Sequence, residues 1–76
     1  MTNNKFHKWI YDMPADEKIE FAINHGFLTQ VETIVCGFFN CDRESVSDYI
    51  KDYPLDAWYA MKSQLEDDCI RIYLED

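Results

Sequence analysis

The side chains best suited to chemistry in this sequence are two histidines and three cysteines, His7, His25, Cys36, Cys41 and Cys69. Sets of such residues can bind zinc, and a cysteine beside a histidine can act as a nucleophile. However, four residues separate Cys36 from Cys41 and the others are scattered, which is not typical of a structural zinc site. Cys36 and Cys69 also fall on predicted inner helix faces, where cysteine acts as a small apolar residue. We therefore expect reduced thiols, no metal ligands and no cysteine nucleophile.

Carboxylates are the other abundant reactive group. The chain has 15 acidic and 7 basic residues and a formal net charge of -8. Almost all the carboxylates lie on predicted polar faces, so the sequence indicates no acid–base pair with perturbed pKa values. With only two glycines it has no glycine-rich loop that could hold a phosphate. We expect no catalytic residues, no cofactor and a protein that is not an enzyme.

The carboxylates are arranged in a pattern of their own. Glu44, Asp48 and Asp52 are four residues apart, which on a helix makes one row with steps of about 6 Å. The last segment adds further members, Asp56, Glu66, Asp67 and Asp68. One interpretation is an acidic face that binds a basic partner. The alternative is a solvated face that keeps a small apolar protein soluble, and an i, i+4 pair between Asp67 and Arg71 would favour that alternative locally.

Three tyrosines fall outside the predicted inner stripes, Tyr11, Tyr59 and Tyr73. Aromatic side chains surrounded by charge are typical anchors of protein interfaces. A small helical domain with wide inner faces would also need them, so both interpretations stay open.

The elements that must position these residues follow from apolar spacing. In the first segment, Phe6, Trp9, Ile10 and Met13 occur at i, i+3, i+4 and i+7, which predicts a helix. A second helix begins at Pro14, has a narrow inner stripe and stops at Gly26. The last helix runs from Leu55 to about Leu74, and its inner stripe comprises Leu55, Trp58, Met61, Leu65, Cys69 and Ile72.

The middle of the chain predicts two more helices. Residues 28–39 are rich in Val, Ile and Thr, so a strand is the rival structure. Thr29 and Glu32 have the spacing of a capping box, and this favours a helix whose inner face carries Leu28, Val31, Ile34, Val35, Phe38 and Phe39. Asn40 then turns the chain in a left-handed conformation, and Asp42 caps a fourth helix. That helix turns Val46, Tyr49, Ile50 and Tyr53 inward.

These elements predict an all-α fold, a single acidic domain over residues 1–76 with about five short helices. The longest apolar run, residues 34–39, is too short to cross a bilayer, and the N-terminus has no apolar signal segment. We expect no membrane partner and a cytoplasmic location.

Residues 32–51 resemble the helix-turn-helix unit of many transcription regulators. Cys36 takes the place of the small residue in the first helix, Asn40 that of the turn glycine, and Val46 that of the buried residue in the second helix. The resemblance covers about a quarter of the chain and implies two steeply crossing helices. It also implies that the second helix would contact DNA, here through Arg43, Ser47 and Lys51.

The charges around those positions disagree with DNA reading. Asp42, Glu44 and Asp48 outnumber the two cations, whereas DNA binding depends on cations that displace counterions from phosphates. Direct binding to DNA is therefore not expected.

We expect instead a small acidic module that docks on the basic surface of a nucleic-acid-handling protein and inhibits or modulates it. Such a nucleic-acid mimic would suit a phage-type or mobile-element accessory protein, for example an anti-defence factor or a modulator of a polymerase or nuclease. The alternatives are a helix-turn-helix transcription regulator and a helical dimerisation or scaffold module, and a homodimer is left open.

Overall fold

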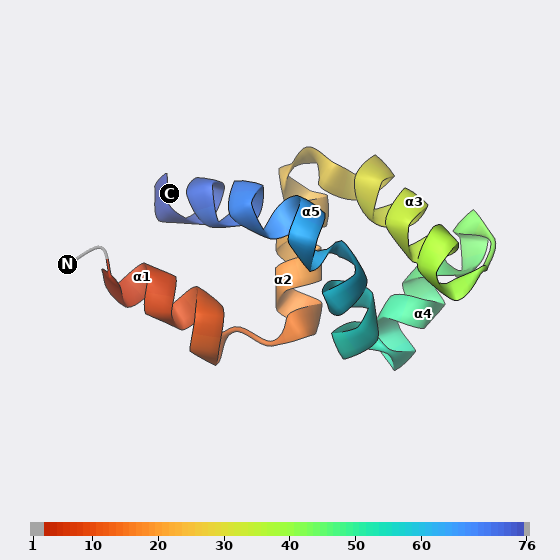
Figure 1. The fold of residues 1–76 in the computed structure, drawn as a ribbon, viewed down its shortest axis with the longest axis horizontal. Coiled ribbons are helices and arrows are strands. Elements are labelled where there is room, and N and C mark those ends of the chain that lie inside the picture. Colours follow the sequence, from red (N-terminus) through yellow and green to blue (C-terminus); the bar gives the residue numbers. More distant parts are fainter. Residues whose placement is uncertain (1–2, 76) are drawn as a thin grey trace.

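A computed structural model describes residues 3–75, and the side chains from Asn4 onward; residues 1, 2 and 76 of the predicted domain lie outside this part. The described residues form helices joined by short connections, and no strand occurs among them (Figure 1). The predicted all-α fold is therefore confirmed. The elements in chain order are α1 (Asn3–His7), a π-type turn η1 (Lys8–Asp12), α2 (Ala15–Ala22), a second π-type turn η2 (Ile23–Phe27), α3 (Leu28–Phe39), a 3-10 turn η3 (Arg43–Ser45), α4 (Val46–Asp52) and α5 (Pro54–Glu75).

The long helix α5 organises the domain. In Figure 1 it runs from the middle of the molecule, where α2 crosses it, to the end where α1 lies beside its C-terminal half. The Lys5 ammonium donates a hydrogen bond of 3.0 Å to the backbone oxygen of Tyr73, which fastens α1 to this half. Helices α3 and α4 pack at the opposite end, so the domain is elongated, with extents of 42 × 20 × 18 Å.

One apolar core runs through these elements. Trp9, Val46 and Trp58 are buried in it, from three different elements, and Ile34 of α3 packs against it. The inner helix faces that spacing predicts for these four residues therefore meet in one core. The other fully or nearly buried apolar side chains are Ile19, Ala22, Val31, Val35, Ala57, Met61, Leu65 and Cys69.

Two residues turn the chain where the sequence predicts, and a proline begins the last helix. Gly26 has a φ of 98° and turns the chain between α2 and α3. Asn40, with φ 56° and ψ 51°, ends α3 in the left-handed conformation, and its N–H donates to the Cys36 carbonyl. Pro54 is the first residue of α5, where its missing N–H costs nothing. Residues 28–39 are helical, so the rival strand is excluded.

The predicted capping bonds are wrong in detail. Helix α3 begins at Leu28 and follows η2 directly, so Thr29 lies inside the first turn and cannot act as the N-cap of a capping box. Asp42 does have the extended backbone of a cap, but its side chain makes no capping hydrogen bond. Its backbone oxygen instead accepts from the Ser45 N–H at 2.9 Å, which starts the 3-10 turn before α4.

Some predicted inner positions are exposed. Leu55 is 75% exposed, Phe38 55% and Tyr53 51%, and Phe6 and Leu28 are also exposed. Most of these residues lie near a helix end, beyond the part that a neighbouring helix covers. Spacing shows which face of a helix is apolar, but it does not show how far along the helix that face is covered.

None of the helices within residues 3–75 combines the length and apolar character needed to cross a membrane.

Candidate functional site

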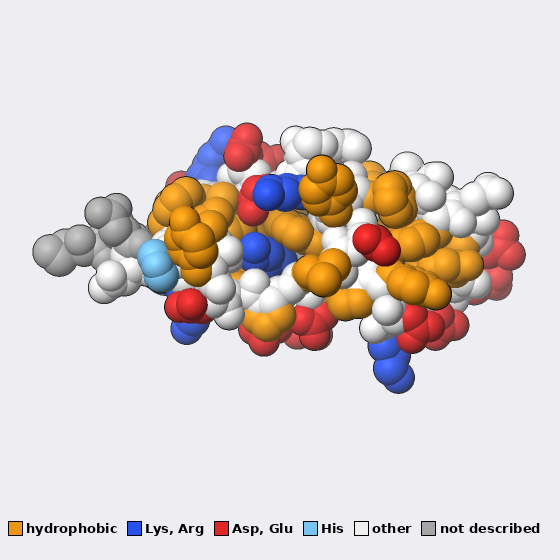
Figure 2. All heavy atoms as spheres, turned by 60° about the horizontal axis from the view of Figure 1, so that its bottom comes forward, with side chains coloured by type: hydrophobic (Ala, Val, Ile, Leu, Met, Phe, Trp, Pro, Cys, Tyr) orange, Lys and Arg blue, Asp and Glu red, His pale blue; other side chains and the backbone are white. Residues whose placement is uncertain are grey.

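The most prominent surface feature is a group of rings and carboxylates at the end of the molecule formed by α3 and α4. We call it the aromatic–acidic face and define it as Phe38, Phe39, Asp48, Tyr49, Asp52 and Tyr53. Figure 2 shows hydrophobic side chains gathered at this end, with Asp and Glu side chains at their rim.

Helix spacing and the turn at Asn40 build this face. Tyr49 on α4 and Tyr53 directly after it are i, i+4 neighbours, with ring centroids 6.1 Å apart. The turn returns the chain so that the Phe39 ring lies 4.8 Å from that of Tyr49 and 5.9 Å from that of Tyr53. Phe38 meets Phe39 edge-on at 4.9 Å. The four rings therefore support one another although two of them face solvent.

The carboxylates of this face lie beside the rings. Asp48, Tyr49, Asp52 and Tyr53 together line a hollow of about 190 Å³ on α4. Ring faces attract cations, and carboxylates pair with them. This arrangement can therefore hold an arginine or lysine side chain of another molecule.

The predicted acidic row divides between the two ends of the molecule. Glu44 lies in the 3-10 turn η3 and not on α4, so the expected helical row begins at Asp48. Glu44 and Asp56 are both exposed. In the sequence they lie within four residues of Asp48 and Tyr53, which belong to the aromatic–acidic face. Glu66, Asp67 and Asp68 lie in the later part of α5.

Two members of the α5 group already have partners within the chain. Glu66 accepts a hydrogen bond of 3.2 Å from the Trp9 indole N–H. Asp68 pairs with Arg71 at 3.6 Å, and this i, i+3 pair takes the place of the predicted pair between Asp67 and Arg71. Asp67 is exposed, and no contact of its side chain is evident.

The predicted tyrosine anchors differ in their surroundings. Tyr11 and Tyr59 are largely exposed, and the Tyr11 ring contacts that of His7 at 4.7 Å. Tyr73 is half-buried and packs against Trp9 at 5.3 Å and Phe21 at 5.5 Å. Its ring thus belongs to the wall of the core more than to an outer surface.

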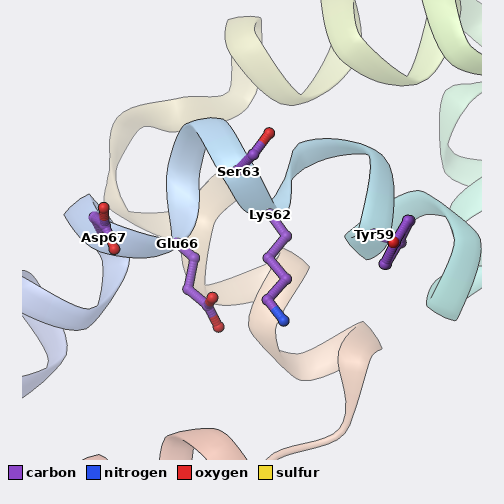
Figure 3. Close-up of a pocket in the computed structure, with 5 residues that line it drawn as sticks. All are labelled: Tyr59, Lys62, Ser63, Glu66 and Asp67. Carbon is purple, nitrogen blue, oxygen red and sulfur yellow. The ribbon is translucent and has the colours of Figure 1, made fainter.

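Another hollow, of about 490 Å³, lies along α5 and is lined by Tyr59, Glu66 and Asp67 among others (Figure 3). Lys62 and Glu66 extend to one side of the helix, and Ser63 points to another. All its lining residues come from this one helix, so it is an open surface between side chains. We do not regard it as a ligand site.

Lys18 is a notable residue that sequence reasoning missed. Only 8% of it is exposed, and its ammonium lies 5.7 Å from the Trp9 ring centroid and 5.6 Å from that of Trp58. Burial lowers the pKa of Lys18, and the nearby Glu66 partly offsets this effect. Its position was readable, because Ala15, Lys18, Ile19 and Ala22 have helical one-face spacing.

Of the residues that would read DNA, one pairs with a carboxylate and two share a groove with several. Arg43 pairs with Glu32 of α3 at 3.6 Å. Ser47 and Lys51 line a groove of about 300 Å³ between α2 and α4, whose other wall carries Asp16, Glu17 and Glu20. A phosphate placed against Lys51 would thus face several negative charges.

Two of the three cysteine thiols have a raised pKa. Burial raises the pKa of Cys69 to about 11, and burial together with Cys36 raises the pKa of Cys41. Neither thiol is activated, since a nucleophilic thiol needs a lowered pKa. The His25 ring stacks on that of Phe21 at 3.9 Å. No group of three or more potential metal ligands occurs within residues 3–75.

Comparison with protein-family models, with curated proteins and with solved structures found no match to this chain. The function must therefore be argued from the residues and their geometry.

Proposed function

We propose that this chain is a small, non-catalytic acidic module that docks on the basic surface of a nucleic-acid-handling protein and inhibits or modulates it. The observation that carries the proposal is the aromatic–acidic face, in which Asp48 and Asp52 share a hollow with the Tyr49 and Tyr53 rings. A cytoplasmic location and an accessory role in a phage or mobile element suit this activity.

The chemistry of the face suits such a target. Proteins that hold single-stranded nucleic acid combine a basic groove with side chains on which bases stack. A surface that offers carboxylates and exposed rings together can occupy both parts of that groove. The net charge of -8 adds long-range attraction to a basic partner and increases the association rate.

The distribution of the cations supports docking on a protein over reading DNA. Arg43 is paired with Glu32, and Lys51 shares a groove with the carboxylates of α2. Few cations are thus left to displace counterions from phosphates, which is the source of most non-specific DNA affinity.

The proposal can be tested by capture from a lysate of the native host. We expect immobilised parent protein to retain a nucleic-acid-binding protein that added single-stranded or duplex DNA releases. The Asp48→Asn/Asp52→Asn variant should retain less of it, because both side chains keep their size and lose their charge.

The control carries Asp67→Asn and Glu75→Gln, which remove the same total charge elsewhere on α5. It should capture as much as the parent. Equal capture by both double variants, or a partner that nucleic acid does not release, would count against the proposal.

A further inference from the structure

A second surface lies on the other side of α4. The groove between α2 and α4 has a volume of about 300 Å³, which is at the lower limit of small-molecule pockets. Figure 1 shows α2 and α4 on either side of the first turns of α5, and Pro54 of α5 also lines the groove. It is large enough for one bulky side chain, and too small for a drug-sized ligand to be buried.

The floor of the groove is aliphatic. Ile19 is fully buried beneath it, and Ile23 and Ile50 are half-buried on its two sides. The apolar surface of a half-buried isoleucine gains free energy when another apolar group removes it from water. The floor therefore favours a branched aliphatic side chain.

The rim of the groove is asymmetric in charge. Asp16, Glu17 and Glu20, all exposed, stand on the α2 wall, and the exposed Lys51 stands on the α4 wall. These carboxylates are not gathered closely enough to hold a metal ion, as no such group occurs in the described residues. These carboxylates are instead suited to pair with a cationic side chain of a partner. An aliphatic side chain next to that cation in the partner would then fill the floor of the groove.

We propose that the α2–α4 groove receives a large aliphatic side chain of a protein partner, next to an arginine or lysine that faces the carboxylates of α2. The inference rests on the proposed function only in taking the partner to be a protein with a basic surface. Because α4 carries this groove on one side and the aromatic–acidic face on another, a basic segment that reaches round α4 contacts both.

The test is a titration of the isotope-labelled protein with a blocked hexapeptide, Gly-Arg-Leu-Ile-Arg-Gly, followed by amide chemical shifts. Saturable shifts should centre on Ile23 and Ile50. A peptide with both arginines changed to glutamate, or with both aliphatic residues changed to alanine, should bind roughly tenfold more weakly. Equal affinity for the glutamate peptide, or no saturable shift, would overturn the inference.

Two variants sharpen the result. Ser47→Phe places a ring in the groove from an exposed position and should abolish the shifts. Glu17→Gln/Glu20→Gln should weaken binding by several-fold, while the equally neutralised Asp67→Asn/Glu75→Gln control stays within about twofold of the parent. Unchanged binding by Ser47→Phe would place the peptide elsewhere.

The outcome is separable from that of the proposed function. Shifts confined to Asp48 and Tyr53 would overturn the groove inference and leave the aromatic–acidic face supported. Shifts at Ile23 and Ile50, together with full partner capture by Asp48→Asn/Asp52→Asn, would support the groove inference and count against docking through the aromatic–acidic face.

Discussion

The indole N–H of Trp9 donates a hydrogen bond of 3.2 Å to a carboxylate oxygen of Glu66, 57 residues further along the chain. This bond joins the first helical segment to α5 at the edge of the core. The acidic pattern of the sequence predicts that Glu66 is available to a partner molecule, whereas in the fold it accepts a hydrogen bond from within the chain.

Glu66→Ala should therefore destabilise the domain by about 1–2 kcal/mol, because it leaves the Trp9 N–H without an acceptor. Glu66→Gln keeps an acceptor for the Trp9 N–H and should therefore reduce the free energy of unfolding by less. Urea unfolding followed by Trp fluorescence measures both. The neighbouring Asp67→Ala is the control and should change stability by less than about 0.5 kcal/mol. Equal effects of the two alanine variants would mean that the hydrogen bond contributes nothing.

Lys18→Met should leave the domain equally stable or more stable at neutral pH. Burial disfavours the charged form of Lys18 by more than the attraction of Glu66 favours it, so its pKa is lowered. Between the folded pKa and the ordinary value of 10.5 the unfolded chain binds more protons, so the contribution of this lysine to stability rises with pH. The gain of Lys18→Met over the parent should shrink toward pH 10.5. A gain that grows with pH would contradict the sign.

The contribution of Cys69 to stability should fall as pH rises, whereas that of Lys18 should increase. Burial raises its pKa from 9.0 to about 11, so between these values the folded state holds a proton that the unfolded state has lost. Its contribution to stability is complete below pH 9 and falls by up to about 2–3 kcal/mol by pH 11. The stability difference between the parent and Cys69→Ala should decrease over this interval in chemical unfolding. A constant difference would show that the thiol titrates as it does in the unfolded chain.

Val46→Asp should unfold the domain. Val46 is 5% exposed, and an unpaired buried carboxylate costs about 3–5 kcal/mol against a small total stability. Circular dichroism would show the loss of helix. The adjacent exposed Ser47→Asp should keep the parent spectrum. Retention of helix by Val46→Asp would mean that the packing of α4 on α3 and α5 is misassigned.

The parts of this fold that follow from sequence are those set by local chemistry. The stripe through Trp58, Met61 and Cys69 and the turns at Gly26 and Asn40 depend on spacing and on backbone freedom. Coverage by other helices is not local. Leu55 continues the same stripe but stays exposed, although Ala57 and Trp58 nearby on α5 are buried.

The candidate site shows the same division. Asp48 and Asp52 could be assigned to one row from their spacing alone. The contact between the rings of Phe39 and Tyr53 could not be predicted from spacing, because it depends on how the turn at Asn40 folds α4 back against α3. Lys18 was overlooked because a charged residue was assigned to a polar face, although its spacing placed it inside.

The most direct test of docking through the aromatic–acidic face is the association rate constant with the captured partner at low salt. We expect Asp48→Asn/Asp52→Asn to associate about tenfold more slowly than the parent and to lose part of its salt dependence. Asp67→Asn/Glu75→Gln, with the same net charge, should retain most of the parent rate. Equal association rates for the parent and Asp48→Asn/Asp52→Asn would contradict docking through the aromatic–acidic face. These carboxylates would then be only a solvated helix face.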